Sequence, residues 1–210
     1  MIVSESAPLI LGSASPRRRE ILGSLGVPIR VVPGSADETP KPGEPPSSYL
    51  ARVVRDKLED VARRVAGPAP GIVVADTIVV VDDDILGKPG DEDEARILLG
   101  RIVGRSHLVQ TRYAISAFPE IEIPRIERTV ESIVTMRAAS TVEIARYAAT
   151  GEGLDKAGAY AAQGIGAFLV QRIEGSFSNV VGLPACEVVV DLTILGLLES
   201  FPRARDPASS

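Results

Sequence analysis

Residues 72–81 have the sequence IVVADTIVVV, in which eight of ten side chains are apolar and one, Asp76, is an acid. A run of Val and Ile of this length is typical of a strand in a hydrophobic core. The three aspartates at 82–84 interrupt the run and predict a polar turn, after which the sequence DILGKP returns toward the strand. This segment predicts a hairpin around which the rest of the chain must fold.

Similar Val- and Ile-rich runs alternate with segments of helical periodicity, which is typical of an α/β domain. The expected strands cover 8–12, 28–33, 72–81, 106–117, 126–137 and 165–173. The expected helices cover 16–26, about 48–66, 91–99, 141–150 and 184–200, and the last is apolar enough to be largely buried. The expected N-caps are Ser15, Ser47 or Ser48, and Ser140, the last in a capping box with Glu143. Because the strands do not follow one another as simple βαβ units, we predict an α/β fold with a mixed sheet flanked by helices.

The composition excludes several classes of function. At 210 residues the chain is expected to form one domain over 1–201 with a frayed tail over 202–210. A single cysteine and a single histidine exclude an internal disulfide, a Cys-based zinc site and HExxH chemistry. A net charge of −5 argues against a broad nucleic-acid-binding face. No membrane span or signal peptide is evident, so we expect a cytosolic protein.

The segment GSASPRRREIL at 12–22 is the first candidate site. A predicted strand ends in small residues, and a helix follows with three arginines in its first turn. Free N–H groups at a helix N-terminus bind anions, and hydroxyls and guanidinium groups add donors for a phosphate. These donors are Ser13, Ser15, Arg17, Arg18 and Arg19. The alternative is a capped helix whose arginines are only solvated.

Asp76 is the second candidate, because a carboxylate within such an apolar run must be paired, hydrogen-bonded or metal-bound. This setting suits a general base or a metal ligand; the alternative is an aspartate that only bonds to backbone. Thr77 is expected on the opposite face of the strand. In the loop at 34–46, Asp37 and Glu38 are possible magnesium ligands together with Asp76, although a solvated acidic loop is the simpler interpretation.

Three lysines lie in distinctive local settings. Lys88 lies between Gly87 and Pro89, Lys156 lies in the Gly-flanked sequence GLDKAGAY, and Lys57 lies on the long helix. Each alone is typical of a surface lysine. Together with the arginines they could balance the charge of a triphosphate.

Other motifs are missing or weak. There is no GxxxxGK[ST] loop, no GxGxxG after a strand and no GxSxG. His107 has no evident nucleophile partner, so we interpret it as structural. Cys186 is most simply a small buried hydrophobe.

Seven segments in order resemble the Maf family of nucleoside triphosphate pyrophosphatases. They are LILGSASPRRREIL (9–22), DE (37–38), SYLARVVRDK (48–57), VVADTIVVVDDDILGKP (73–89), GRSHLVQT (104–111), ESIVTMR (131–137) and the stretch 143–184, which contains GLDKAGAYAAQG. The resemblance implies an α/β fold with a deep cleft, similar to inosine triphosphate pyrophosphatases, and often a homodimer. It implies hydrolysis of the α–β phosphoanhydride of a nucleotide with Mg²⁺ or Mn²⁺.

Roles for individual residues also follow from the resemblance. It implies that Asp76 is the proton acceptor, assisted by Lys57 and Lys88, and that Glu38 and Asp76 bind the metal. The implied substrate-binding residues are Ser13, Ser15, Arg17, Arg18 and Lys156, and Arg17, Thr77 and Gln163 match positions associated with base choice.

The sequence DKAGAYAAQG resembles the branch that acts on dTTP, UTP and modified pyrimidine triphosphates. A glutamine at 163 offers a donor and an acceptor to a pyrimidine edge, whereas the 7-methyl-GTP branch usually carries an acid there. Departures from the family pattern are Ala161–Ala162, Met136 and the tail after Phe201. The alternatives are the same chemistry on 7-methyl-GTP, a non-catalytic nucleotide-binding regulator of septum formation, or nucleic-acid binding through the arginines at 17–19, for which this acidic chain offers too little basic surface.

Overall fold

Strand β3 (Gly71–Val81) is the strand around which the sheet is built in the computed structural model, which describes residues 1–202. The other strands in these residues are β1 (Leu9–Leu11), β2 (Ile29–Val31), β4 (Asp84–Leu86), β5 (Ser106–Ala117), β6 (Glu120–Met136) and β7 (Val170–Glu174). The helices are α1 (Pro16–Ser24), α2 (Pro46–Arg64), α3 (Glu92–Ile102), α4 (Thr141–Ala148), α5 (Phe177–Val181) and α6 (Ala185–Ile194). Two 3₁₀ helices, η1 (Ala157–Ala159) and η2 (Ile165–Leu169), complete the list.

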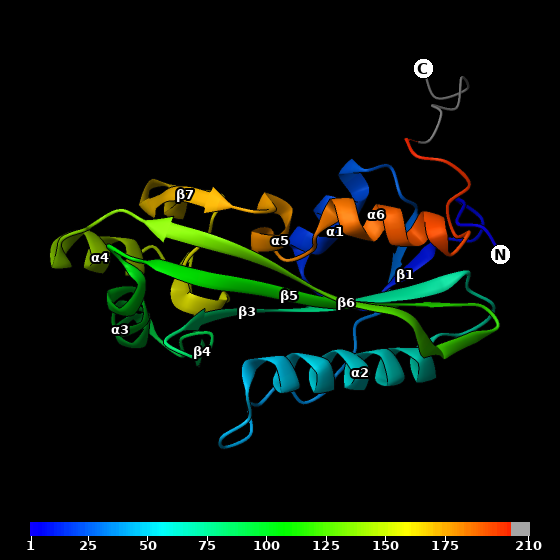
Figure 1. The fold of residues 1–210 in the computed structure, drawn as a ribbon, viewed down its shortest axis with the longest axis horizontal. Coiled ribbons are helices and arrows are strands. Elements are labelled where there is room, and N and C mark those ends of the chain that lie inside the picture. Colours follow the sequence, from blue (N-terminus) through cyan, green and yellow to red (C-terminus); the bar gives the residue numbers. More distant parts are fainter. Residues whose placement is uncertain (203–210) are drawn as a thin grey trace.

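The sheet is mixed, which confirms the predicted fold class. Its strand order is β2-β1-β3-β5-β6-β7, and β4 pairs with β3 as the second arm of the predicted hairpin. β1 is parallel to β2 and β3, whereas β3, β5, β6 and β7 pair antiparallel in succession. Helices cover both faces, with α2 on one and α1 and α6 on the other (Figure 1).

Alternate residues of β3 pack against opposite layers. Ile72 and Val74 belong to the core beneath α2, whereas Val73 and Ala75 belong to the core beneath α1 and α6. This alternation follows from the two-residue period of a strand. Because both faces are covered, an apolar run without polar alternation is the sequence that this strand requires.

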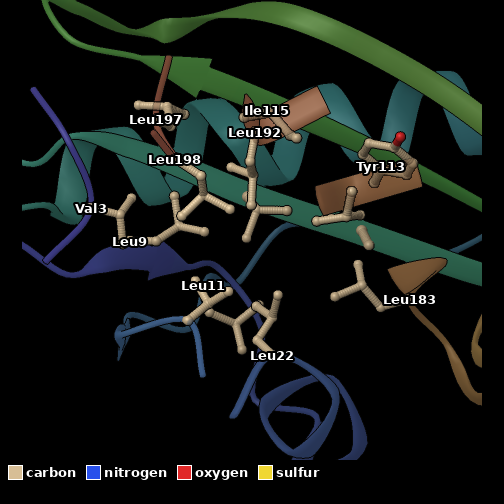
Figure 2. Close-up of a cluster of buried hydrophobic side chains, with 14 residues drawn as sticks. Val3, Leu9, Leu11, Leu22, Tyr113, Ile115, Leu183, Leu192, Leu197 and Leu198 are labelled. Atoms are coloured by element: carbon tan, nitrogen blue, oxygen red, sulfur yellow. The ribbon is translucent and has the colours of Figure 1, made fainter. Parts of the chain in front are cut away.

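The core beneath α1 and α6 joins the two ends of the chain. Leu192, Leu197 and Leu198 face Leu9 and Leu11 of β1 (Figure 2), and all five side chains are buried. The N-terminal strand and the C-terminal helix therefore stabilise one another.

Several predicted boundaries were wrong near prolines and glycines. α2 has Pro45 as its N-cap and begins at Pro46, so Ser47 and Ser48 lie inside its first turn; proline fixes the backbone φ for the first helical position. Residues 165–169 form η2 instead of a strand, because the chain turns at Gly164, whose φ is +82°. β6 begins at Glu120, before the predicted start, and α3 continues to Ile102.

The C-terminal helix also differs from the prediction. α6 ends at Ile194, and Gly196 follows with a φ of +66°. Its outer face exposes Val190 and Ile194, the latter 69% exposed, so the helix is not largely buried. Its apolar composition over-predicted burial. The short helix α5 was not predicted, and residues 203–210 of the predicted tail lie outside the described residues.

The predicted capping box at the start of α4 is confirmed, with Ser140 and Glu143 bonded reciprocally. The turn at 82–84 is also the predicted hairpin turn, in which Asp82 and Asp83 have positive φ values of 50° and 64°. Among residues 1–202, no helix combines the length and the apolar character that a membrane crossing requires.

Candidate active site

A cleft of about 1050 Å³ opens where the ends of β1 and α1 meet the middle of β3. The loop before α2, the β4 hairpin and the segment 152–164 form its other walls. Most of the predicted site residues line it: Ser13, Ser15, Arg17, Arg18, Glu38, Lys57, Asp76, Thr77, Lys88, Lys156 and Gln163. The fold therefore brings together side chains from six separate parts of the sequence.

The ammonium group of Lys57 joins two carboxylates at the bottom of this cleft. Lys57 Nζ donates to Asp76 Oδ1 at 2.7 Å and lies 2.9 Å from Glu38 Oε1. Lys57 and Asp76 are only 8% and 7% exposed. Burial acts to raise the pKa of Glu38, but the charge and hydrogen bond of Lys57, with the charges of Lys88 and Arg18, hold it below its ordinary value.

The periods of β3 and α2 explain why these groups meet. Asp76 follows Ile72 and Val74 on the side of β3 that faces α2, and Lys57 lies on the buried face of α2 between Val54 and Leu58. A lysine among apolar residues is unfavourable without a partner. The buried carboxylate of Asp76 supplies that partner, so the two polar groups compensate one another.

Glu38 reaches the cleft because α2 holds its loop in place. Arg52 on α2 donates to both oxygens of Glu44, each at 2.7 Å, and to the carbonyl of Thr39. Tyr49 Oη donates to the carbonyl of Glu38 itself at 2.8 Å. Sequence reasoning missed Arg52 and gave Tyr49 no role, because their contacts to this loop depend on how the loop folds back.

Asp37, in contrast, is not among the cleft-lining residues, so its interpretation as a metal ligand was wrong. Its Oδ1 accepts the N–H of Thr39 at 2.9 Å, a local turn bond that directs the carboxylate back to its own loop. Of the two acids, only Glu38 lines the cleft.

The loop between β1 and α1, together with the first turn of α1, forms another wall of the cleft. Arg18 is buried, and three of its nitrogens donate hydrogen bonds to other residues of the chain. Nε donates to the carbonyl of Gly182 at 2.8 Å, Nη1 to Ser13 Oγ at 3.1 Å and Nη2 to Thr77 Oγ1 at 3.1 Å. Desolvation lowers the pKa of Arg18, and the charges of Asp76 and Glu38 oppose that shift. Arg18 therefore fixes the loop and leaves its remaining N–H groups for a ligand.

The other members of this loop differ from one another. Ser15 is the N-cap residue of α1, but its side chain makes no cap hydrogen bond. Arg17 lies 3.9 Å from Asp155 across the cleft mouth. Arg19 is exposed and does not line the cleft. The prediction that Arg19 supplies a donor to this site was therefore wrong.

Thr77 lies on the face of β3 opposite Asp76, as predicted. Its hydroxyl is 2.9 Å from that of Thr111 on β5 in addition to its contact with Arg18. Lys88 is exposed at the rim, while Lys156 Nζ donates to the carbonyl of Glu152 and to Asp155 Oδ1, each at 2.5 Å.

His107 and Cys186 lie outside the cleft wall. His107 is buried, its Nε2 lies 2.8 Å from Tyr160 Oη, and burial lowers its pKa to about 4. Its position agrees with a structural role. Cys186 is exposed, so its interpretation as a buried residue was wrong, because the outer face of α6 has no layer above it in the described residues.

Glu38 and Asp76 are the residues that could hold a divalent cation. Their carboxylates already converge on one positive group, Lys57 Nζ. Among the residues that the structure describes, no group of three or more His, Cys, Asp or Glu side chains could hold a metal ion. Two carboxylates are what Mg²⁺ usually takes from a protein, and it completes its octahedron with water and phosphate oxygens.

Comparisons with known proteins show which proteins this chain is similar to. A family model described as "Maf-like protein" matches residues 8–194. A dTTP/UTP pyrophosphatase of Myxococcus xanthus is 46% identical over 90% of this chain and 93% of its own length. Proteins with the same name from Syntrophotalea carbinolica (43%, 94% of this chain and 89% of that one) and Geobacter sulfurreducens (44%, 92% and 100%) are similarly related.

Among solved structures, a HAM1 protein from Coxiella burnetii matches with a TM-score of 0.40 at 12% identity, over 62% of this chain and 73% of that one. The Staphylococcus aureus Ham1 protein matches with a TM-score of 0.38 at 11% identity, over 63% and 72%.

Proposed function

This chain belongs to the Maf family. Because its relatives are named dTTP/UTP pyrophosphatases, we propose that it hydrolyses dTTP and UTP to the nucleoside monophosphate and pyrophosphate. The bridge that Lys57 makes between Asp76 and Glu38 is the observation that carries the proposal. It joins two carboxylates and a buried ammonium group in one cleft that is also lined by serine and arginine side chains.

The proposed reaction is attack of water on the α-phosphorus. The bond from that phosphorus to the α–β bridging oxygen breaks, and pyrophosphate leaves with the bond electrons. Asp76 accepts the proton of the attacking water, which is the role of a general base. Lys57, one hydrogen bond from Asp76, orients the carboxylate and supplies positive charge next to the reacting phosphate.

The triphosphate is proposed to lie between the loop after β1, Lys88 at the rim and the partly buried Lys156. Hydrogen bonds to the phosphates would come from one side of the cleft, from Ser13, Ser15, Arg17 and the free N–H groups of Arg18. Lys88 and Lys156 would supply positive charge from the other walls of the cleft. A divalent cation held by Glu38 and Asp76 would supply charge neutralisation and orientation of the phosphate oxygens.

Base choice is proposed to rest on Gln163, with Arg17 and Thr77 nearby in the same cleft. The carboxamide of Gln163 offers one donor group and one acceptor to a pyrimidine edge. We also propose action on the cytoplasmic nucleotide pool. The homodimer implied by the family resemblance stays a prediction, which sedimentation equilibrium would test.

The direct test is pyrophosphate release from dTTP, UTP, CTP, GTP and 7-methyl-GTP with Mg²⁺ or Mn²⁺, with the wild type beside Asp76→Asn. Removal of a general base should lower kcat by about 100- to 10,000-fold, with nucleotide affinity kept within about tenfold. Asp83→Asn is the matched control, because Asp83 is an exposed turn residue outside the cleft. A silent wild type that still binds nucleotide would overturn the proposal, and full activity of Asp76→Asn would overturn the assignment of the base.

A further inference from the structure

Gln163 lines the cleft, and its position there is set by the backbone of the loop 161–166 and not by contacts of its own side chain. Gln163 is exposed, and its side chain makes no hydrogen bond to any described residue. The place of its carboxamide relative to Asp76 and Lys57 therefore depends on how the backbone on either side is held.

Two side chains from outside the loop hold both of its ends. Tyr147 Oη accepts the N–H of Ala161 at 3.0 Å and donates to Glu152 Oε2 at 2.9 Å. Glu152 accepts the N–H of Ile165 on Oε1 at 2.8 Å and the N–H of Gly166 on Oε2 at 2.7 Å. The backbone on both sides of Gln163, at Ala161 and at Ile165 and Gly166, is thus hydrogen-bonded to one phenol–carboxylate pair.

The glycines of this loop let the pair approach the backbone. A Cβ at Gly164 would lie 2.3 Å from Glu152 Oε1, and φ there is +82°. A Cβ at Gly166 would lie 2.4 Å from Tyr147 Oη. At both positions the pair therefore packs directly against the loop backbone, which a residue with a side chain would not allow without a shift of these groups.

The pair is also well suited to remain in this form near neutral pH. Burial acts to raise the pKa of Glu152, but the N–H donors of Gly166 and Ile165 and the hydroxyl of Tyr147 hold it below its ordinary value. Burial raises the pKa of the Tyr147 hydroxyl above its ordinary value. An ionised carboxylate therefore faces a protonated phenol.

We propose that Glu152 and Tyr147 are positioning residues for base selection: they fix the backbone around Gln163 so that its carboxamide meets the edge of the base. The inference rests on the proposed function. Glu152 lines the cleft, and its main-chain carbonyl accepts a hydrogen bond from Lys156 Nζ, a contact that a change of side chain does not remove.

The test compares kcat/KM for UTP with kcat/KM for GTP, which share a sugar and a triphosphate and differ only in the base. In Glu152→Gln and in Tyr147→Phe, the UTP/GTP ratio should fall about 5- to 30-fold, the range of one to two lost or misaligned hydrogen bonds. Tyr147→Phe changes no charge, so it separates positioning from any effect on the phosphates. Thermal melts establish that each variant is folded.

A double-mutant cycle with Gln163→Ala distinguishes positioning from general loosening of the loop. Once the carboxamide is absent, Glu152→Gln should change the UTP/GTP ratio by less than about twofold. The matched control is Glu143→Gln, since Glu143 also accepts a backbone N–H, from Ser140, but does not line the cleft.

An unchanged UTP/GTP ratio in a folded, active Glu152→Gln variant would overturn the inference and leave the proposed function intact. If Glu152→Gln lowers the UTP/GTP ratio equally in the wild type and in Gln163→Ala, the inference would also be overturned and the proposed function would remain intact. If the wild type releases no pyrophosphate from any nucleotide, the proposed function fails and this inference fails with it.

Discussion

Lys57 Nζ lies 2.7 Å from Asp76 Oδ1, and the two residues come from α2 and from the β3 strand that it covers. The pair is buried, so removal of Lys57 would leave the Asp76 carboxylate without its ion-pair partner. This contact connects the packing of the helix on the sheet with the chemistry of the cleft.

Replacement of Lys57 by Met should lower kcat/KM for UTP by about 100-fold or more, because a charge aimed at the reacting phosphate is lost. The ammonium also holds the pKa of Glu38 below its ordinary value, so the Glu38 carboxyl should take up its proton at a higher pH in the variant. Lys41→Met is the matched control, since Lys41 is exposed and outside the cleft. Wild-type kinetics in Lys57→Met would show that the bridge is only structural.

Gln163→Glu should reduce turnover of UTP relative to GTP by about tenfold, because the carboxylate has lost the N–H₂ donor and adds a charge near the base. Steady-state kinetics on both nucleotides measure the ratio. Gln171→Glu provides the same change at an exposed position outside the cleft. If both variants keep the wild-type ratio, Gln163 does not read the base.

Tyr113→Phe should lower the free energy of unfolding by about 1–3 kcal/mol, the usual result of removing a partner from a buried polar group. Tyr113 Oη donates to Asp191 Oδ2 at 2.5 Å, both residues are fully buried, and Arg128 donates to Asp191 Oδ1 at 2.8 Å. Urea unfolding measures the change. Since Tyr113 does not line the cleft, kcat/KM should stay at the wild-type level; a large loss of activity in a stable variant would contradict this account.

His107 should make stability fall as the pH falls. Burial lowers its folded pKa to about 4, against an ordinary value of 6.5, so the unfolded chain binds the proton first. The stabilisation is complete above the unfolded pKa and is lost as the pH falls toward the folded one, and between pH 7 and pH 5 the loss is about 2 kcal/mol.

Chemical denaturation at both pH values measures this loss, with His107→Gln as the comparison. The glutamine does not titrate and can still reach Tyr160 Oη, so the difference between the two proteins isolates the histidine. Equal pH dependence in the two proteins would refute the assignment.

The sequence alone determined the elements whose pattern is periodic and long. The run around Asp76, the strand at 106–117 and the capping box of Ser140 all lie where the pattern predicted, because a strand buried on both faces and a capped helix each require particular residues locally. The turn at 82–84 is predictable for the same reason. The resemblance to a known family additionally predicted which polar residues would lie together in one cleft.

Tertiary structure decided what local pattern does not contain. Residues 165–169 form a 3₁₀ helix and not a strand: the chain turns at Gly164, and Glu152, which lies outside this segment, accepts the N–H groups of Ile165 and Gly166. Glu38 faces the cleft and Asp37 does not because the loop folds back on Tyr49 and Arg52. Cys186 is exposed because the outer side of α6 meets no other layer of the described chain. In each case the outcome depends on contacts between residues far apart in the sequence, which the periodicity of a single segment cannot specify.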